Sequence, residues 1–267
     1  MSRVTEPGHS TDAGPTLDIV NEHLEFPRVS LVEPTDSRYV HLAATVDEPS
    51  LPIPPVYLRD SDEKQALLAA CKRLCADLSE MKGVVDATVF EALVRPPGRG
   101  VNLQQTDRTV AVADFDVAVL IEVEDNTALD RVEEHSAYRE LVSRLEAAAQ
   151  SFYRVVGTNE RRIGPVAHDT DGVFLFNYFF SEYTERTLEV WEYTAGWFQA
   201  ETGLDNSTLI LPQDPEKSEY AVINHCRWNG LWDVLPALLV KRTFRSYVLA
   251  NFEANKVAPM PILYTLA

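Results

Sequence analysis

An order of secondary-structure patterns that occurs twice is the feature of this sequence that most constrains its fold. Alternating apolar residues predict strands, and apolar residues spaced by three and four predict helices, in the order β-α-β-β-α-β. In the first copy the expected strands are 39–47, 87–94, 115–124 and 152–156, and the expected helices are 63–82 and 129–148. In the second copy the expected strands are 173–180, 207–211, 220–228 and 262–266, and the expected helices are 184–202 and 231–252.

Local signals support the helix boundaries. In the helix of residues 63–82, five apolar residues step by four and three along one stripe: Leu67, Cys71, Leu74, Leu78 and Met81. Ser61 is expected to cap the first turn of this helix, and Gly83 is expected to end it. Pro236 is expected to interrupt helix 231–252 or to start it anew, because proline lacks the N–H group that a helix interior uses.

This repeated order implies a fold. One βαββαβ unit makes a four-stranded antiparallel sheet with both helices on one face, which leaves the other face apolar and in need of a cover. Two copies in one chain can press these faces together. We therefore expect an α+β protein in which two tandem ferredoxin-like units form an intramolecular α/β barrel. The expected divisions are an extended arm, 1–38, a first unit, 39–160, and a second unit, 172–267.

Composition narrows the classes of partner. The net charge of -17 over 267 residues disfavours nucleic acid and anionic membrane surfaces as partners. No run of about 18 apolar residues is present, and the first residues lack the apolar core of a secretory signal. Three cysteines are too few for a disulfide scaffold and favour a reducing compartment. We therefore expect a cytoplasmic protein.

Two further motif classes are missing from the sequence. Cys71 and Cys75 lie one helical turn apart, but no other cysteine or histidine cluster completes four ligands, so we expect no metal site. Glycine-rich phosphate loops of the dinucleotide-binding type are absent, so any flavin is expected to bind transiently as a co-substrate.

The segment of residues 220–232 contains the best candidates for chemistry. Because side chains alternate along a strand, Asn224, Cys226 and Trp228 should share one face, and His225 should lie on the other. An amide and an indole N–H can hold a quinone or phenolate oxygen where negative charge develops. The alternative is a strand end with a tryptophan that serves only the core.

Other residues of the second copy are candidates for binding a flat substrate. Phe174, Phe176 and Tyr178 share one strand face and suit either an aromatic wall or an ordinary core. The helices add three further candidates: Trp191, Trp232 and Tyr247. His225 is either a general acid or base or a buried histidine whose hydrogen bonds are satisfied.

The spacing Asn-x-x-x-Trp at the end of a third strand, followed by a helix, resembles the antibiotic-biosynthesis monooxygenases. This superfamily includes anthrone oxygenases that make quinones in aromatic polyketide pathways. Its Asn and Trp bind the polycyclic substrate, and the resemblance carries these roles to Asn224 and Trp228. The family also has a Tyr on the following helix, but that stretch here holds Trp232 and Val234, so its proton-handling role has no counterpart. The resemblance covers 172–267.

The first copy lacks this pair. Aligning the two third strands places Ile121 opposite Asn224 and Asp125 opposite Trp228, so the first copy is expected to be structural. Length, tandem architecture and an acidic extension together resemble one subgroup, the oxygenases of the jadomycin, gilvocarcin and kinamycin pathways. Those enzymes cleave or contract the B ring of an angucyclinone with dioxygen and reduced flavin, FADH2 or FMNH2, which a separate flavin reductase supplies.

The resemblance thus implies oxidative C–C bond cleavage or ring contraction of a polycyclic aromatic polyketide, without a metal. Two alternatives stay open. One is a non-oxidative cyclase or ligand-binding protein on the same scaffold, because fold alone does not fix function. The other is a cofactor-free, anthrone-type monooxygenase that forms a quinone. The sequence also leaves open whether two chains pair as a homodimer.

Overall fold

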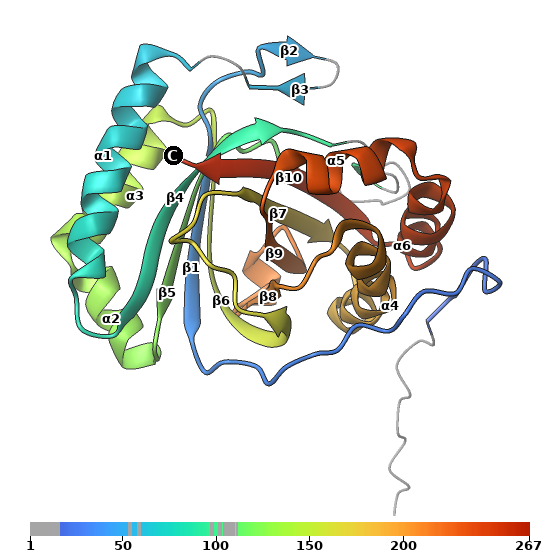
Figure 1. Cartoon of the computed structure of the whole chain (residues 1–267). Coiled ribbons are helices and arrows are strands. Elements are labelled where there is room, and N and C mark those ends of the chain that lie inside the picture. Colours follow the sequence, from blue (N-terminus) through green and yellow to red (C-terminus); the bar gives the residue numbers. More distant parts are fainter. Residues whose placement is uncertain are drawn as a thin grey trace, which may run out of the picture.

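An eight-stranded antiparallel barrel forms the centre of the protein in a computed structural model (Figure 1). The structure describes residues 17–267 except 53–54, 58–59, 97–98, 101–102, 104–109 and 111. The barrel strands are β1 (Arg38–Thr45), β4 (Val84–Val94), β5 (Val117–Val123), β6 (Ser151–Gly164), β7 (Val173–Phe180), β8 (Ser207–Pro212), β9 (Val222–Trp228) and β10 (Ala258–Leu266). A short hairpin, β2 (Leu51–Pro52) and β3 (Pro55–Val56), extends the sheet beyond β4.

The two halves of the chain arrange their strands in the same order. The first half reads β6-β1-β5-β4 and the second reads β10-β7-β9-β8, which is fourth, first, third, second in each. The pairings β6–β8 and β4–β10 join the halves and close the barrel. The expected α+β barrel within one chain is therefore confirmed.

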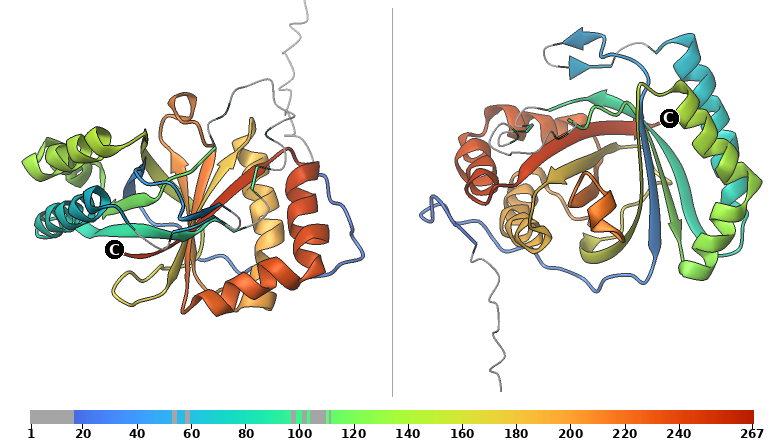
Figure 2. Two further views of the ribbon diagram at one scale, coloured as in Figure 1. Left: turned by 90° about the horizontal axis from the view of Figure 1, so that it is seen from above. Right: turned by 180° about the vertical axis from the view of Figure 1, so that it is seen from behind.

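Six α-helices, counted over the described residues, cover the outside of the barrel (Figure 2). The first half carries α1 (Asp62–Ser79), α2 (Asn126–Glu134) and α3 (Ser136–Ala148) on one side. The second half carries α4 (Thr184–Thr202), α5 (Leu231–Val240) and α6 (Ala250–Ala254), with a π-helical segment, Phe244–Leu249, before α6. None of the described helices is both long and apolar enough to cross a membrane.

Two helix predictions need correction. The single helix expected over 129–148 is two helices, because His135 adopts an extended conformation (φ -73°, ψ 142°) and its Nδ1 accepts from the N–H of Ala137. The helix expected over 231–252 is indeed interrupted, but at Lys241 (φ -69°, ψ 119°) and not at Pro236, which lies within α5. The carbonyl of Trp232 loses its helical partner there, but Trp232 is 84% exposed, so water can satisfy that carbonyl. Ser61 caps α1 as predicted, accepting from the N–H of Lys64 at 3.0 Å.

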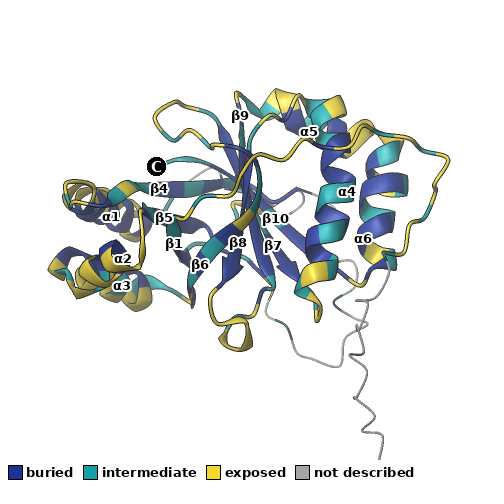
Figure 3. Ribbon diagram, turned by 90° about the horizontal axis from the view of Figure 1, so that it is seen from below, coloured by how far each residue is buried: buried dark blue, intermediate teal, exposed yellow. Residues whose placement is uncertain are grey.

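Most strands are buried on both faces, as the dark blue ribbons between two helical layers in Figure 3 show, whereas β4 and β6 also carry intermediate and exposed residues. Along β7, even-numbered residues such as Phe176 point into the barrel, and odd-numbered residues such as Leu175 pack against the second-half helices. The barrel interior is one aromatic-rich core, and each helical layer forms a separate apolar core with its own sheet. In each half of the protein, a site can therefore form between the strands and the helices that cover them.

The described part of the N-terminal arm runs along the second-half helices. The side chain of Asn251 accepts from the N–H of Val20 at 2.9 Å, and the side chain of Asn255 donates to the carbonyl of Asp18 at 2.7 Å. The ring of Phe26 packs on Tyr247, with 4.7 Å between ring centroids. The arm therefore packs on the outer surface of the second-half helices.

Gly196 on α4 permits this close approach, so we expect Gly196→Ala to displace the arm. A Cβ atom at Gly196 would lie 1.6 Å from the carbonyl oxygen of Pro27. We expect a loss of about 1–3 kcal/mol in the free energy of unfolding, the usual cost of overpacking. Urea unfolding and limited proteolysis of the arm measure both effects. Gly230→Ala is the control, because its new Cβ would meet no atom closer than 3.9 Å. Equal stability and equal proteolysis of the two variants would contradict this prediction.

Candidate functional site

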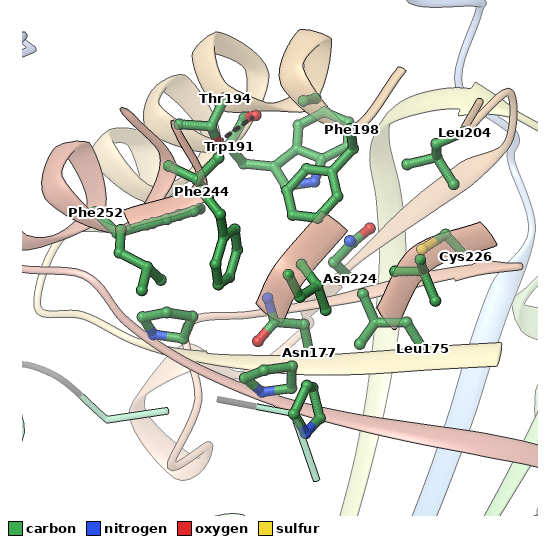
Figure 4. Close-up of a pocket in the computed structure, with 18 of the residues that line it drawn as sticks. Leu175, Asn177, Trp191, Thr194, Phe198, Leu204, Asn224, Cys226, Phe244 and Phe252 are labelled. Atoms are coloured by element: carbon green, nitrogen blue, oxygen red, sulfur yellow. Dashed lines mark hydrogen bonds between the residues drawn. The ribbon is translucent and has the colours of Figure 1, made fainter. Parts of the chain in front are cut away.

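A narrow cavity lies between the second-half sheet and its helices (Figure 4). Strands β7, β9 and β10 form its floor, and α4 with the segment 244–252 forms its roof. Most of the lining is apolar or aromatic, as in typical small-molecule sites. Polar side chains are few, and three of them are amides or hydroxyls: Asn177, Thr194 and Asn224.

Asn224 reaches the cavity from β9, together with Cys226 and Trp228, as the alternation of the strand predicted. Its Oδ1 accepts a hydrogen bond from the hydroxyl of Ser207 on β8. Its Nδ2 has no acceptor among the described residues, and Figure 4 shows the amide at the cavity. The geometry therefore leaves Asn224 with a donor for a ligand.

Trp228 forms a wall of the cavity, but its N–H is engaged within the protein. Nε1 donates to the hydroxyl of Thr202 at 2.9 Å, which ties the end of β9 to the end of α4. The predicted hydrogen bond from Trp228 to a substrate oxygen is therefore corrected: this side chain supplies aromatic surface and fixes the strand.

The three aromatic residues predicted on helices have different positions. Trp191 lines the roof of the cavity. Trp232 points to solvent, because the apolar face of α5 that packs inward is formed by Val234 and Leu238. Tyr247 is buried behind the roof, where its hydroxyl donates to the carbonyl of Tyr193 at 3.1 Å. Neither Trp232 nor Tyr247 is therefore among the residues that line the cavity.

The aromatic face of β7 does not line the cavity either. Phe174, Phe176 and Tyr178 point into the barrel and pack in its interior core. The physical reason is strand register: Phe176 pairs with His225, and Asn177 pairs with Asn224. Directly paired residues lie on the same side of a sheet, so the aromatic face belongs with His225.

His225 is part of a buried hydrogen-bonded chain on the barrel side. Its Nδ1 lies 3.0 Å from the carbonyl of Leu175, its Nε2 lies 2.8 Å from Nε2 of His168, and His168 Nδ1 lies 2.7 Å from Asp86. A carbonyl only accepts, so His225 Nδ1 holds the proton and its Nε2 accepts from His168. Asp86 also accepts from the hydroxyl of Thr88, as a carboxylate does. This pattern links His225 to Asp86 through His168.

The pKa shifts of His225 and Asp86 agree with these hydrogen bonds. Burial, with the nearby His168, lowers the pKa of His225 far below its usual value. Burial alone would raise the pKa of Asp86, but the hydrogen bond and charge of His168 hold it below its usual value. The three hydrogen-bonded residues, Asp86, His168 and His225, line a second cavity at the mouth of the barrel. His225 therefore faces away from Asn224, and it cannot act as an acid or base for a ligand in the first cavity.

A second buried histidine, His41, allows a prediction about pH. Its Nε2 accepts from the hydroxyl of Tyr178 at 2.8 Å, and burial lowers its pKa to about 3. The unfolded chain binds this proton near pH 6.5 and the folded chain does not, so the unfolded state holds more protons between these values. We therefore expect the free energy of unfolding to fall as pH decreases below about 6.5, by about 1.4 kcal/mol per pH unit for each such histidine.

Urea unfolding at pH 7 and pH 5 measures this effect. His41→Gln should reduce the change in the free energy of unfolding between pH 7 and pH 5 by the contribution of one histidine. His225→Gln should reduce it by a similar amount. A variant that keeps the full pH dependence of the wild type would show that the replaced histidine does not cause it.

Asn177 is a residue of the cavity that our sequence analysis did not assign to a site. It is the one amide residue of the segment VFLFNYFF, and it lies on the face opposite Phe174, Phe176 and Tyr178. Its Oδ1 is buried and has no hydrogen-bond partner within the described residues. A lone amide in an otherwise apolar strand was a readable signal, but only the register showed that it lies beside Asn224.

The first half has no comparable arrangement at the aligned positions. Ile121 is fully buried in the core between the first sheet and its helices. Asp125 caps α2, where it accepts from the N–H of Ala128 at 2.8 Å. Both residues therefore have structural roles at the positions that correspond to Asn224 and Trp228.

The cavity fits some ligand groups better than others. Its apolar lining suits flat aromatic rings, but the described residues that line it include no lysine or arginine. A flavin nucleotide also carries phosphate, which proteins bind with cationic side chains or backbone N–H groups. The lining therefore does not fit a whole flavin nucleotide. Within the described residues, no group of three or more histidine, cysteine or acidic side chains is arranged to hold a metal ion.

Comparisons with known proteins give similarity of fold. Neither a family model nor a curated protein sequence matches the chain. A solved structure of an anthrone oxidase-like protein has a TM-score of 0.59 and 10% identity, covering 89% of this chain and 94% of its own. A candidate monooxygenase from Fusobacterium nucleatum has a TM-score of 0.54 and 10% identity, covering 86% of this chain and 91% of its own. A candidate chlorite dismutase has a TM-score of 0.46 and 10% identity, and the match covers 87% of this chain and 95% of its own.

Proposed function

We propose that this protein is an oxygenase that acts on a polycyclic aromatic polyketide of the angucycline class. In this proposal the second-half cavity holds a hydroxyquinone or hydroquinone, and the reaction cleaves a ring C–C bond or contracts a ring. The observation that carries the proposal is the amide donor of Asn224, which has no acceptor among the described residues, in an apolar cavity with several aromatic lining residues. The fold similarity to an anthrone oxidase-like protein supports the same class.

The side chains of the cavity have two tasks in this reaction. Asn224 Nδ2 donates to a substrate oxygen on which negative charge develops when a hydroxyl ionises or when oxygen adds to the ring. Ser207 fixes the orientation of that amide. Trp191, Trp228 and Phe198 enclose the rings and exclude water, so the donor acts in surroundings of low polarity, where its interaction is stronger.

The co-substrates follow from the same proposal. Dioxygen supplies one oxygen atom, which inserts into a ring C–C bond beside a carbonyl, and the other oxygen atom leaves as water. Reduced flavin, FADH2 or FMNH2, supplied by a separate flavin reductase, would provide the two electrons and two protons. Because the lining does not fit a flavin nucleotide, we assign no residue of this chain to a flavin phosphate.

The duplicated strand order adds an evolutionary proposal. Both halves share the order fourth, first, third, second, which is the order of a ferredoxin-like sheet. We therefore regard the chain as two tandem ferredoxin-like units, of which the second retains the substrate cavity and the first is structural.

Isotope labelling tests the proposed function. The protein is incubated with an angucyclinone, NAD(P)H, flavin, a flavin reductase and ¹⁸O₂, and the product is analysed by mass spectrometry. We expect a ring-opened or ring-contracted product that contains one ¹⁸O atom and that requires the reductase. A labelled quinone formed without the reductase would favour the cofactor-free alternative. A product without ¹⁸O would favour a cyclase, and the absence of any product would favour a ligand-binding protein.

A further inference from the structure

We infer that Asn177 is a specificity-determining residue that recognises a hydroxyl group on the substrate, beside the oxygen that Asn224 binds. This inference rests on the proposed binding of an aromatic substrate in the second-half cavity. It assigns a positioning role to a residue that the resemblance to oxygenases does not include.

The carbonyl group of Asn177 has no protein partner. Its Oδ1 is buried and accepts no hydrogen bond from any described residue. The neighbouring strand cannot provide a backbone donor at this position, because the residue paired with Asn177 on β10 is Pro261, which has no N–H. Pro96 and Pro259 also line the cavity, and neither can offer a backbone N–H.

A buried acceptor without a donor is unfavourable, because the carbonyl has lost its hydrogen bond to water. A leucine of similar size at this position would avoid that cost and extend the apolar lining. The amide is therefore best explained by a ligand that completes its hydrogen bond. Only a donor can do so, such as a phenolic hydroxyl, whereas a ketone or quinone oxygen cannot.

The neighbour of Asn177 makes the requirement more specific. Asn177 and Asn224 are directly paired on β7 and β9, so their Cβ atoms lie about 4.5–5.5 Å apart. Asn224 Oδ1 is held by Ser207, which leaves its Nδ2 as a donor. The pair therefore presents the donor of Asn224 beside Oδ1 of Asn177, an acceptor whose own Nδ2 can also donate. A ring carbonyl and a hydroxyl that is too far from that carbonyl to donate to it can engage both residues. A carbonyl alone leaves Oδ1 of Asn177 without a donor.

A cycle of two ligands and two proteins tests this inference. The ligands are 2-hydroxyanthraquinone, whose hydroxyl lies too far from either ring carbonyl to donate to it, and anthraquinone, which has no hydroxyl. The proteins are the wild type and Asn177→Leu, which keeps the volume but removes the acceptor. Quenching of tryptophan fluorescence measures the dissociation constants, because Trp191 and Trp228 line the cavity.

We expect the wild type to bind the hydroxylated compound about tenfold more tightly, a difference of about 1.4 kcal/mol. Asn177→Leu should bind both compounds with similar affinity. Asn224→Ala is the matched control: it should weaken the binding of both compounds and keep the preference for the hydroxyl. Melting temperatures near that of the wild type confirm that each variant is folded.

The possible failures are distinguishable. If Asn177→Leu keeps the preference, or if the wild type shows none, the role of Asn177 is overturned while the proposed cavity stands. If the wild type binds neither compound, the proposed substrate site fails, and the inference about Asn177 fails with it.

Discussion

Replacing Asn224 by alanine is expected to lower the turnover number of the oxygenase reaction by about 10²-fold or more, the effect of losing one donor to a developing oxyanion. The side chain lies on the floor of an apolar cavity, and its Nδ2 is the donor that has no protein acceptor among the described residues. Asn224 is only 6% exposed, so little water can replace the lost hydrogen bond. The loss should therefore appear in turnover more than in substrate binding.

Formation of ¹⁸O-labelled product under substrate saturation measures this effect. Cys226→Ala is the control, because Cys226 lies on the same strand face but offers only a weak donor. The Asn224 variant also leaves the hydroxyl of Ser207 without its acceptor, so both variants are compared well below their melting temperatures. Full activity of Asn224→Ala together with an inactive Cys226→Ala would remove Asn224 from the mechanism.

Replacing Lys64 by alanine is expected to lower the free energy of unfolding by about 3–5 kcal/mol, the usual cost of leaving a buried charge without its partner. Lys64 lies on α1 with a side chain that is 0% exposed. Its Nζ is 2.8 Å from Asp60, 3.2 Å from Glu91 and 3.3 Å from Asp116. The carboxylate of Asp116 is also 0% exposed and would lose its only cationic partner among the described residues.

Urea denaturation at neutral pH measures the loss. Arg144→Ala is the control, because the ion pair of Arg144 with Glu140 is about half exposed, and exposed pairs contribute about 0–1 kcal/mol. Lys64→Ala with Asp116→Asn should recover part of the stability, since the neutral amide does not need a counter-charge. If Lys64→Ala and Arg144→Ala have equal effects, the buried network does not stabilise the fold as we infer.

The sequence alone determined the order of elements and most strand and helix positions. Apolar periodicity is a local property, so the helix Thr184–Thr202 and the strand Val173–Phe180 match the predicted ranges. Alternation along β9 also placed Asn224 and Trp228 on one face and His225 on the other. These results depend on neighbours within a single strand or helix, and such neighbours are fixed by backbone geometry.

The tertiary structure decided what each face contacts, because register between strands depends on pairing across the whole sheet. Pairing of Phe176 with His225 moved the aromatic face of β7 into the barrel, and pairing of Asn177 with Asn224 brought a second amide into the cavity. Thr202, 26 residues before Trp228, took the indole N–H that we had expected a substrate to use. Alternation gives a strand two faces, but only packing against distant elements determines which face becomes core and which becomes a site.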